Sequence, residues 1–212
     1  PLEFAGESHT DKCARLGAAL RDKGESAAVI TLPDSLCWLL NIRGADIARN
    51  PVVHGFVVLH GSAAVDLFVA PQKVADLADH LGDSVTVHAP DVLLAYLGAL
   101  PGPIRLDKAT VPVAVADAVG DRASWGDDPC ALPKACKNEA EVAGSAAAHL
   151  RDGAALVELL AWLDAQTPGT VSETQVVAKL EAARRRDNAL QDISFETIAG
   201  TGPNGAIMHY RV

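Results

Sequence analysis

The stretch Asp192–Tyr210, DISFETIAGTGPNGAIMHY, is the most informative part of this sequence. An apolar run reaches Ile198, a cluster of Gly, Pro and Asn residues follows, and a second apolar run ends at His209. Two apolar runs joined by such residues are typical of two strands connected by a turn. We therefore expect a turn between two strands, with His209 near the end of the second strand.

The glycines of this stretch have the spacing of a nucleotide-binding loop, G-x-G-x-x-G, at Gly200, Gly202 and Gly205. A dinucleotide site needs a helix directly after the glycines, so that the helix N-terminus faces the pyrophosphate. Here Ala206–Tyr210 reads as a strand, and no Gly-Lys-Ser/Thr follows to make a phosphate loop. The spacing leaves two interpretations open: a β-turn without chemistry, or a turn at which backbone closely approaches a ligand.

Composition and charge exclude several classes of function. The chain has 212 residues, is 49% hydrophobic and carries a net charge of -9, so it can bury a core in one large domain or two small ones. We expect no nucleic-acid partner, because an acidic protein has no basic field to displace phosphate counterions. The basic run Arg184–Arg186 is expected to complement the negative end of a helix. We expect no membrane partner, because no run approaches the roughly 20 apolar residues that span a bilayer.

The cysteines argue against a zinc site. None of Cys13, Cys37, Cys130 and Cys136 forms a C-x-x-C pair, and no histidine cluster accompanies them. We expect buried, reduced thiols.

A break in the pattern near Asp127–Pro133 predicts two domains, residues 1–128 and 129–212. The first region alternates helical and apolar strand patterns, with a hairpin signal at His60-Gly61-Ser62, which predicts an α/β domain with a mixed sheet. Strands are expected at residues 27–32, 52–59, 64–69, 85–88 and 104–107, and helices at 10–23, 33–40, 72–81, 91–97 and 111–119.

The second region predicts two helices followed by two strands. The first helix should span Asn138–Gln166, and the second should run from a Ser172 cap to about Arg186. Its two strands would lack partners, so this domain should be incomplete. The inward-facing side chains of the first helix are expected to be Leu150, Val157, Leu160, Ala161 and Leu163.

The remaining polar residues show weaker signals. The cluster Asn41–Asp46 follows an apolar helix, and we expect Arg43 and Asp46 to pin their own loop in preference to lining a cleft. His54 is expected to be structural. The following residues have no partner at ligand spacing in the sequence and are expected to be non-functional: His9, His60, His80, His88, His149, Asp66, Asp83 and Asp107.

Four stretches together resemble the long, three-domain form of aminopeptidase P, the Xaa-Pro aminopeptidase family of pita-bread metallopeptidases. Ser194–Ile198 with Gly200–Ile207 and His209-Tyr210 resembles the entrance to the catalytic domain of that family. The other three stretches match the family in the same order along the chain: Leu2–Ser8 with Lys12, Trp38–Asp46 with Asn50–Val52, and Lys134 with Lys137–Glu141.

The resemblance implies a mixed-sheet creatinase N-terminal-like domain followed by an incomplete α+β pita-bread domain. It also implies a hydrolase that removes the N-terminal residue from peptides with proline in second position. Two divalent metal ions, usually manganese, would polarise the scissile carbonyl and supply the attacking hydroxide. By the same resemblance the intact protein would be a cytoplasmic homodimer.

Only one functional residue of the family carries over to this sequence. His209 would bind the peptide substrate, whereas the metal ligands, two Asp, one His and two Glu, would lie beyond Val212. We therefore expect residues 1–212, as a fragment, to bind no catalytic metal and to be inactive. Two alternatives remain: another pita-bread hydrolase such as a prolidase or creatinase, and a non-catalytic pita-bread protein that binds peptides or histones.

Overall fold

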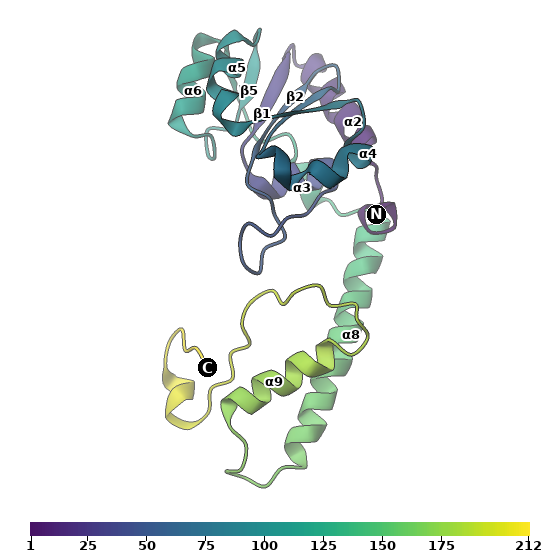
Figure 1. The fold of residues 1–212 in the computed structure, drawn as a ribbon, viewed down its shortest axis with the longest axis vertical. Coiled ribbons are helices and arrows are strands. Elements are labelled where there is room, and N and C mark those ends of the chain that lie inside the picture. Colours follow the sequence, from purple (N-terminus) through teal and green to yellow (C-terminus); the bar gives the residue numbers. More distant parts are fainter. The chain divides into compact units, whose positions relative to one another are not determined.

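The computed structural model describes every residue from Pro1 to Val212, and the chain forms two compact units. We call Pro1–Ala140 the N-terminal unit and Glu141–Val212 the C-terminal unit (Figure 1). The N-terminal unit includes α7 (Ala131–Ala135), where Lys134 pairs with Asp34. The domain boundary predicted between residues 128 and 129 stays a prediction.

A six-stranded mixed sheet forms the centre of the N-terminal unit, in the order β4-β3-β2-β1-β5-β6. The pairs β1–β2 and β2–β3 are antiparallel, whereas β3–β4, β1–β5 and β5–β6 are parallel. The antiparallel pair β2–β3 is the predicted hairpin. The strands are β1 (Ala27–Ile30), β2 (Phe56–His60), β3 (Val65–Phe68), β4 (Val85–His88), β5 (Ile104–Leu106) and β6 (Ala123–Trp125).

The central strand β1 is buried on both faces. Ala28 and Ile30 belong to the apolar core on one face, and Ala27 and Val29 belong to the core on the other. Successive residues of a strand point to opposite faces, so a strand covered on both sides needs a continuous apolar run. This requirement explains why the sequence shows an unbroken apolar run here.

Helices cover both faces of the sheet and make a three-layer α/β/α unit (Figure 1). On one face lie α2 (His9–Asp22) and α3 (Pro33–Leu40), and on the other lie α5 (Leu93–Ala99) and α6 (Val113–Val119). Ser8 caps α2 by accepting a hydrogen bond from the Asp11 amide, and Pro33 begins α3 at a position where a missing N–H costs little. Three short helices complete the unit: α1 (Leu2–Ala5), α4 (Ala78–Leu81) and α7.

The predicted α/β class with a mixed sheet is confirmed, with two local differences. The helix expected over residues 72–81 is broken into two 3-10 turns, Pro71–Lys73 and Ala75–Leu77, followed by α4. Val74, between the turns, has a φ of -123°, which no helix tolerates. The sequence also missed β6, whose three residues are too few to show a period.

The C-terminal unit is built on α8 (Glu139–Asp164) and α9 (Glu173–Arg184), as predicted (Figure 1). Ser172 and Gln175 form a capping box at the start of α9. The basic run at the end of α9 reaches α8: Arg184 pairs with Asp152, and Arg186 pairs with Glu158. No helix in residues 1–212 combines the length and apolar character needed to cross a bilayer.

Two predictions about the C-terminal unit are wrong. The buried residues of α8 are Ala155 and Leu159, whereas the predicted Leu150, Val157 and Leu160 are exposed. An Ala-rich and Leu-rich helix has apolar residues on most of its surface, so periodicity alone does not select the inward face. The strands predicted on either side of the glycines do not form, because a strand needs a neighbour to complete its hydrogen-bond ladder and none pairs with these residues.

A buried lysine connects α2 to the end of α3. Lys12 is 1% exposed, and its ammonium group donates to the Trp38 carbonyl at 2.9 Å and to Asn41 Oδ1 at 2.7 Å. The same group lies 4.2 Å from the centre of the Trp38 ring. Asn41 has a left-handed φ of 52° and donates to the Glu7 carbonyl at 2.8 Å. Lys12 therefore holds the residue that ends α3 and begins the Asn41–Asp46 loop.

Replacing Lys12 with Met should lower the free energy of unfolding by roughly 2 kcal/mol, because two acceptors lose a charged donor while the apolar stem is largely kept. Urea denaturation followed by tryptophan fluorescence measures this change. Lys23→Met is the control, since Lys23 is exposed at the end of the same helix, and it should change stability by less than about 0.5 kcal/mol. Equal stability of the two variants would contradict the role given to Lys12.

Candidate functional site

The segment singled out by the sequence forms a short irregular turn. Residues Gly202–Ala206 make one 3-10 turn, η5, and Gly202 has a φ of +52° that favours glycine. No α-helix follows the glycines. The strand–glycine–helix arrangement of a dinucleotide site is therefore not formed in residues 200–212. We call residues 200–209 the glycine turn.

His209 closes the glycine turn in an uncommon backbone conformation. Its φ is +56°, in the left-handed region that residues other than glycine seldom occupy. The side chain is exposed, and so is Met208 before it. Near neutral pH an exposed imidazole can accept a hydrogen bond from a ligand or donate one to it. Strained conformations persist where surrounding contacts impose them, so the contacts around this residue are informative.

A carboxylate at the start of α9 supplies these contacts. Glu173 Oε1 accepts a hydrogen bond from the Thr201 amide at 2.6 Å. Glu173 Oε2 accepts from Asn204 Nδ2 at 2.9 Å and from the Tyr210 hydroxyl at 2.6 Å. The bond from Tyr210, followed by that from the Thr201 amide, lowers the pKa of Glu173. Sequence reasoning missed Glu173, because 28 residues separate it from Thr201 and nothing in a helix's first turn indicates a distant partner.

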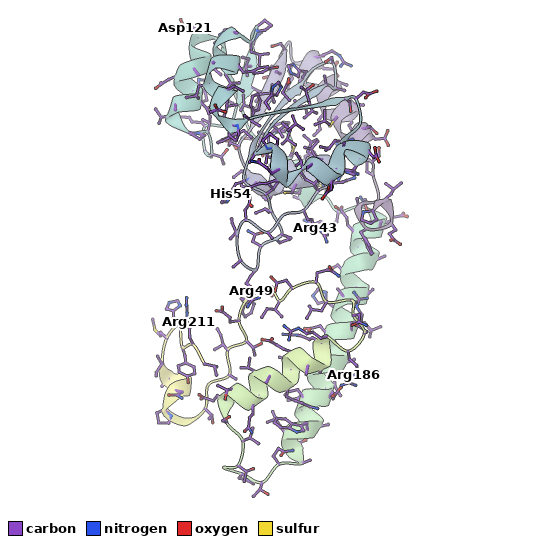
Figure 2. All side chains as sticks on the ribbon, in the orientation of Figure 1. Arg43, Arg49, His54, Asp121, Arg186 and Arg211 are labelled. Carbon is purple, nitrogen blue, oxygen red and sulfur yellow. The ribbon has the colours of Figure 1, made fainter.

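The Asp46 side chain of the Asn41–Asp46 loop is held by residues outside the loop, and no hydrogen bond of Arg43 contributes to the expected pinning. Asp46 Oδ2 accepts from the His54 amide at 2.7 Å and from Lys73 Nζ at 2.5 Å, and the bond from Lys73 lowers the pKa of Asp46. Arg43 is exposed; Arg43 and His54 both lie on the long connection between α3 and β2 (Figure 2). A cavity of about 190 Å³ lies beside this loop, between Arg43, Asp46 and Lys73.

Two of the scattered histidines, His60 and His88, have a carboxylate partner that the sequence did not reveal, and their expected lack of function stays a prediction. Asp66 on β3 accepts hydrogen bonds from His60 Nε2 on β2 and from His88 Nε2 on β4, both at 2.6 Å, and from the Tyr96 hydroxyl on α5 at 2.5 Å. A sheet places neighbouring strands about 5 Å apart, so residues distant in sequence become adjacent. We call this set the Asp66 cluster.

The Asp66 cluster is a half-buried network whose hydrogen bonds favour the ionised form of Asp66. Burial by itself raises the pKa of Asp66, but the bonds from Tyr96, His88 and His60 outweigh burial and lower it. Burial and the bond to Asp66 raise the pKa of Tyr96. The ring of Phe68 stacks on His88, with centroids 4.9 Å apart. The carboxylate thus joins three strands to α5.

No metal site is formed within residues 1–212. No three His, Cys, Asp or Glu side chains gather in a way that could hold a metal ion. In the Asp66 cluster each imidazole Nε2 faces a different carboxylate oxygen, so the donors do not converge on one open point. Cys13, Cys37 and Cys130 are buried and Cys136 is exposed, all as free thiols, and burial raises the pKa of Cys13 to about 12.

Comparison with known families assigns both parts of the chain. Residues 1–141 match the Creatinase/Prolidase N-terminal domain, and residues 143–212 match Metallopeptidase family M24. Curated relatives include the probable Xaa-Pro aminopeptidase P of Laccaria bicolor, 39% identical over 99% of this chain, and that of Aspergillus clavatus, 35% identical over 100%. The chain covers 34% of each relative, so it spans about a third of their length.

Two solved structures show the same fold. The X-prolyl aminopeptidase of Caenorhabditis elegans, described as a cytosolic enzyme with a dinuclear active site, is 28% identical with a TM-score of 0.86. That similarity covers 93% of this chain and 34% of the nematode protein. The Xaa-Pro dipeptidase of Bacillus anthracis has a TM-score of 0.63 over 85% of this chain and 50% of its own. At 18% identity this second similarity concerns the fold alone.

Replacing Asp66 with Asn should lower the free energy of unfolding at pH 7 by about 2 kcal/mol, the scale of a hydrogen bond to a charged group. Because the pKa of Asp66 is lowered in the folded state, its ionised form stabilises the fold at pH values above the ordinary pKa of about 3.9. This stabilisation is lost as the pH falls through the folded-state pKa. The difference between wild type and variant should therefore shrink below about pH 4, as measured by urea denaturation at several pH values.

Asp121→Asn is the control for this comparison, because Asp121 is exposed at the surface of the N-terminal unit (Figure 2). It should leave stability nearly unchanged at every pH. A loss for Asp66→Asn that is equal at pH 3 and pH 7 would show that the charge of Asp66 does not stabilise the fold.

Proposed function

Because this chain belongs to the creatinase/prolidase N-terminal domain family and continues into metallopeptidase family M24, we propose that the whole protein is an Xaa-Pro aminopeptidase. Such an enzyme removes the N-terminal residue from peptides with proline in second position. The observation that carries this proposal is the 39% identity, over 99% of the chain, to a relative named as a probable Xaa-Pro aminopeptidase P. The structural similarity to an X-prolyl aminopeptidase supports it.

The whole protein should use two divalent metal ions, with manganese as the proposed metal. Membership of family M24 and the dinuclear site of the nematode neighbour support two ions. No group of three or more His, Cys, Asp or Glu side chains that could hold a metal ion is found in residues 1–212. The proposed ligands lie in other parts of the whole protein, and no metal-dependent step is assigned to the residues described.

The proposed contribution of these residues is to bind the substrate. His209 is an exposed imidazole at the end of the glycine turn, and a histidine so placed can donate a hydrogen bond to a peptide carbonyl. Such a donor stabilises negative charge if that charge develops in the transition state. The glycines beside it carry no side chains that would keep a peptide away.

The remaining parts of the proposal concern assembly and location. The whole protein should act as a cytoplasmic homodimer on peptide substrates. The nematode neighbour is described as cytosolic, which supports the location. The homodimer rests on family resemblance.

The full-length protein, loaded with manganese, should release the first residue of an Xaa-Pro-Xaa tripeptide and leave an Xaa-Ala-Xaa tripeptide intact. Separation of the products by chromatography measures this selectivity. Hydrolysis confined to Xaa-Pro dipeptides would instead indicate a prolidase. Absence of hydrolysis together with peptide binding in calorimetry would favour the non-catalytic alternative.

Replacing His209 with Asn in the full-length protein should lower kcat/KM for such a tripeptide about 100-fold, the usual effect of removing one transition-state donor. Asn is chosen because it tolerates a left-handed backbone, so the loss reports the missing imidazole and not a change in backbone strain. His149→Asn is the control, because His149 is exposed on α8. If the two variants had equal activity, His209 would have no role in the reaction.

A further inference from the structure

Glu173 holds the glycine turn at three points. One carboxylate oxygen accepts from the Thr201 amide, which precedes η5. The other accepts from Asn204 within η5 and from Tyr210, the residue after His209. Asn204 Nδ2 also donates to the Tyr210 hydroxyl at 2.9 Å, so the middle of the turn is joined to the residue that follows it as well as to α9.

Packing does not explain the position of His209. Ile207 is 53% exposed and Met208 is 83% exposed, so the two apolar side chains before it contribute little burial. A left-handed conformation is strained for a residue other than glycine, because its Cβ comes too close to the following carbonyl oxygen. The hydrogen bonds of Tyr210 and Asn204 to Glu173 are the contacts that bracket this conformation.

We propose that Glu173 is a positioning residue for the peptidase reaction, which places the imidazole of His209 by holding Thr201, Asn204 and Tyr210. This inference rests on the proposed function and adds a residue to it. Glu173 does not touch the substrate; it acts through the turn. Catalytic groups displaced by about 1 Å can lose a hundredfold in rate, so a carboxylate that fixes the turn at both ends matters for turnover.

The start of α9 does not depend on this carboxylate for its cap. The capping box is formed by Ser172 and Gln175, with the Gln175 amide donating to Ser172 Oγ and the Ser172 amide donating to Gln175 Oε1. Glu173→Gln therefore keeps the helix start and the side-chain size. It replaces one acceptor oxygen by an NH2 group, which cannot accept a hydrogen bond, so the bond from Thr201 or the bonds from Asn204 and Tyr210 are lost, depending on which way the amide faces.

The kinetic experiment compares Glu173→Gln in the full-length enzyme with Glu139→Gln. Glu139 is also the first residue of a long helix and is exposed, so the control removes the same charge from a helix start. Glu173→Gln should lower kcat about tenfold with a smaller change in KM, while metal content and melting temperature stay near those of Glu139→Gln. In a His209→Asn background Glu173→Gln should change kcat less than about twofold, because the residue through which it acts is gone.

An equal loss in the wild-type and His209→Asn backgrounds would overturn the inference, since Glu173 would then act independently of His209. Normal kcat in Glu173→Gln, alongside a defect in His209→Asn, would overturn the inference and leave the proposed function standing. If wild type cleaves no Xaa-Pro peptide, the proposed function fails, and crystal structures of wild type and Glu173→Gln still test the contact. A shifted glycine turn supports positioning by Glu173, and an unmoved His209 overturns it.

Discussion

The N-terminal unit is organised around β1, a strand that is buried on both faces. Ala27, Ala28 and Ile30 of β1 are at most 1% exposed, and both helical layers pack against this strand. Polar side chains buried at this sheet must therefore find partners. At the start of β1, the buried Glu25 accepts from Arg105 of β5 and from Ser124 of β6. At the other side of the sheet, Asp66 joins β2, β3 and β4 to α5.

The C-terminal unit relies on ion pairs and hydrogen bonds more than on a buried apolar core. It has few buried apolar side chains, Ala155, Leu159, Leu180 and Ile193, and ion pairs connect its two long helices. Its glycine turn is held by one carboxylate at a helix start, where the helix dipole favours negative charge. A residue buried in a core is located by many weak contacts, whereas an exposed turn needs a few strong hydrogen bonds. The proposed substrate contact, His209, depends on bonds of the second kind.

The sequence predicted most helices and strands of the N-terminal unit, because each buried element there carries an apolar run bounded by Gly, Pro or capping residues. The prediction from sequence failed where the outcome depends on a tertiary contact that the local pattern does not reveal. Asp192–Tyr210 has the pattern of two strands, yet no neighbouring strand completes them in residues 1–212. The apolar residues of α8 surround the helix, and only the tertiary structure selects Ala155 and Leu159 as the buried ones. The histidines had no visible partners, because His60 and His88 meet at Asp66 only through the pairing of three strands.

The sequence by itself determined the α/β class, the apolar strand at residues 27–32, the Ser172 cap and the resemblance that identified His209 as a candidate. These features depend on local composition, on the spacing of apolar residues, or on a motif that can be read as a string. Only the tertiary structure decided that Glu173 meets Thr201 and Tyr210, that Lys12 meets Asn41, and that Asp66 gathers three donors. The reason is physical: a hydrogen bond requires two groups within about 3 Å. That distance is set by how helices and strands pack, and sequence separation does not reveal it.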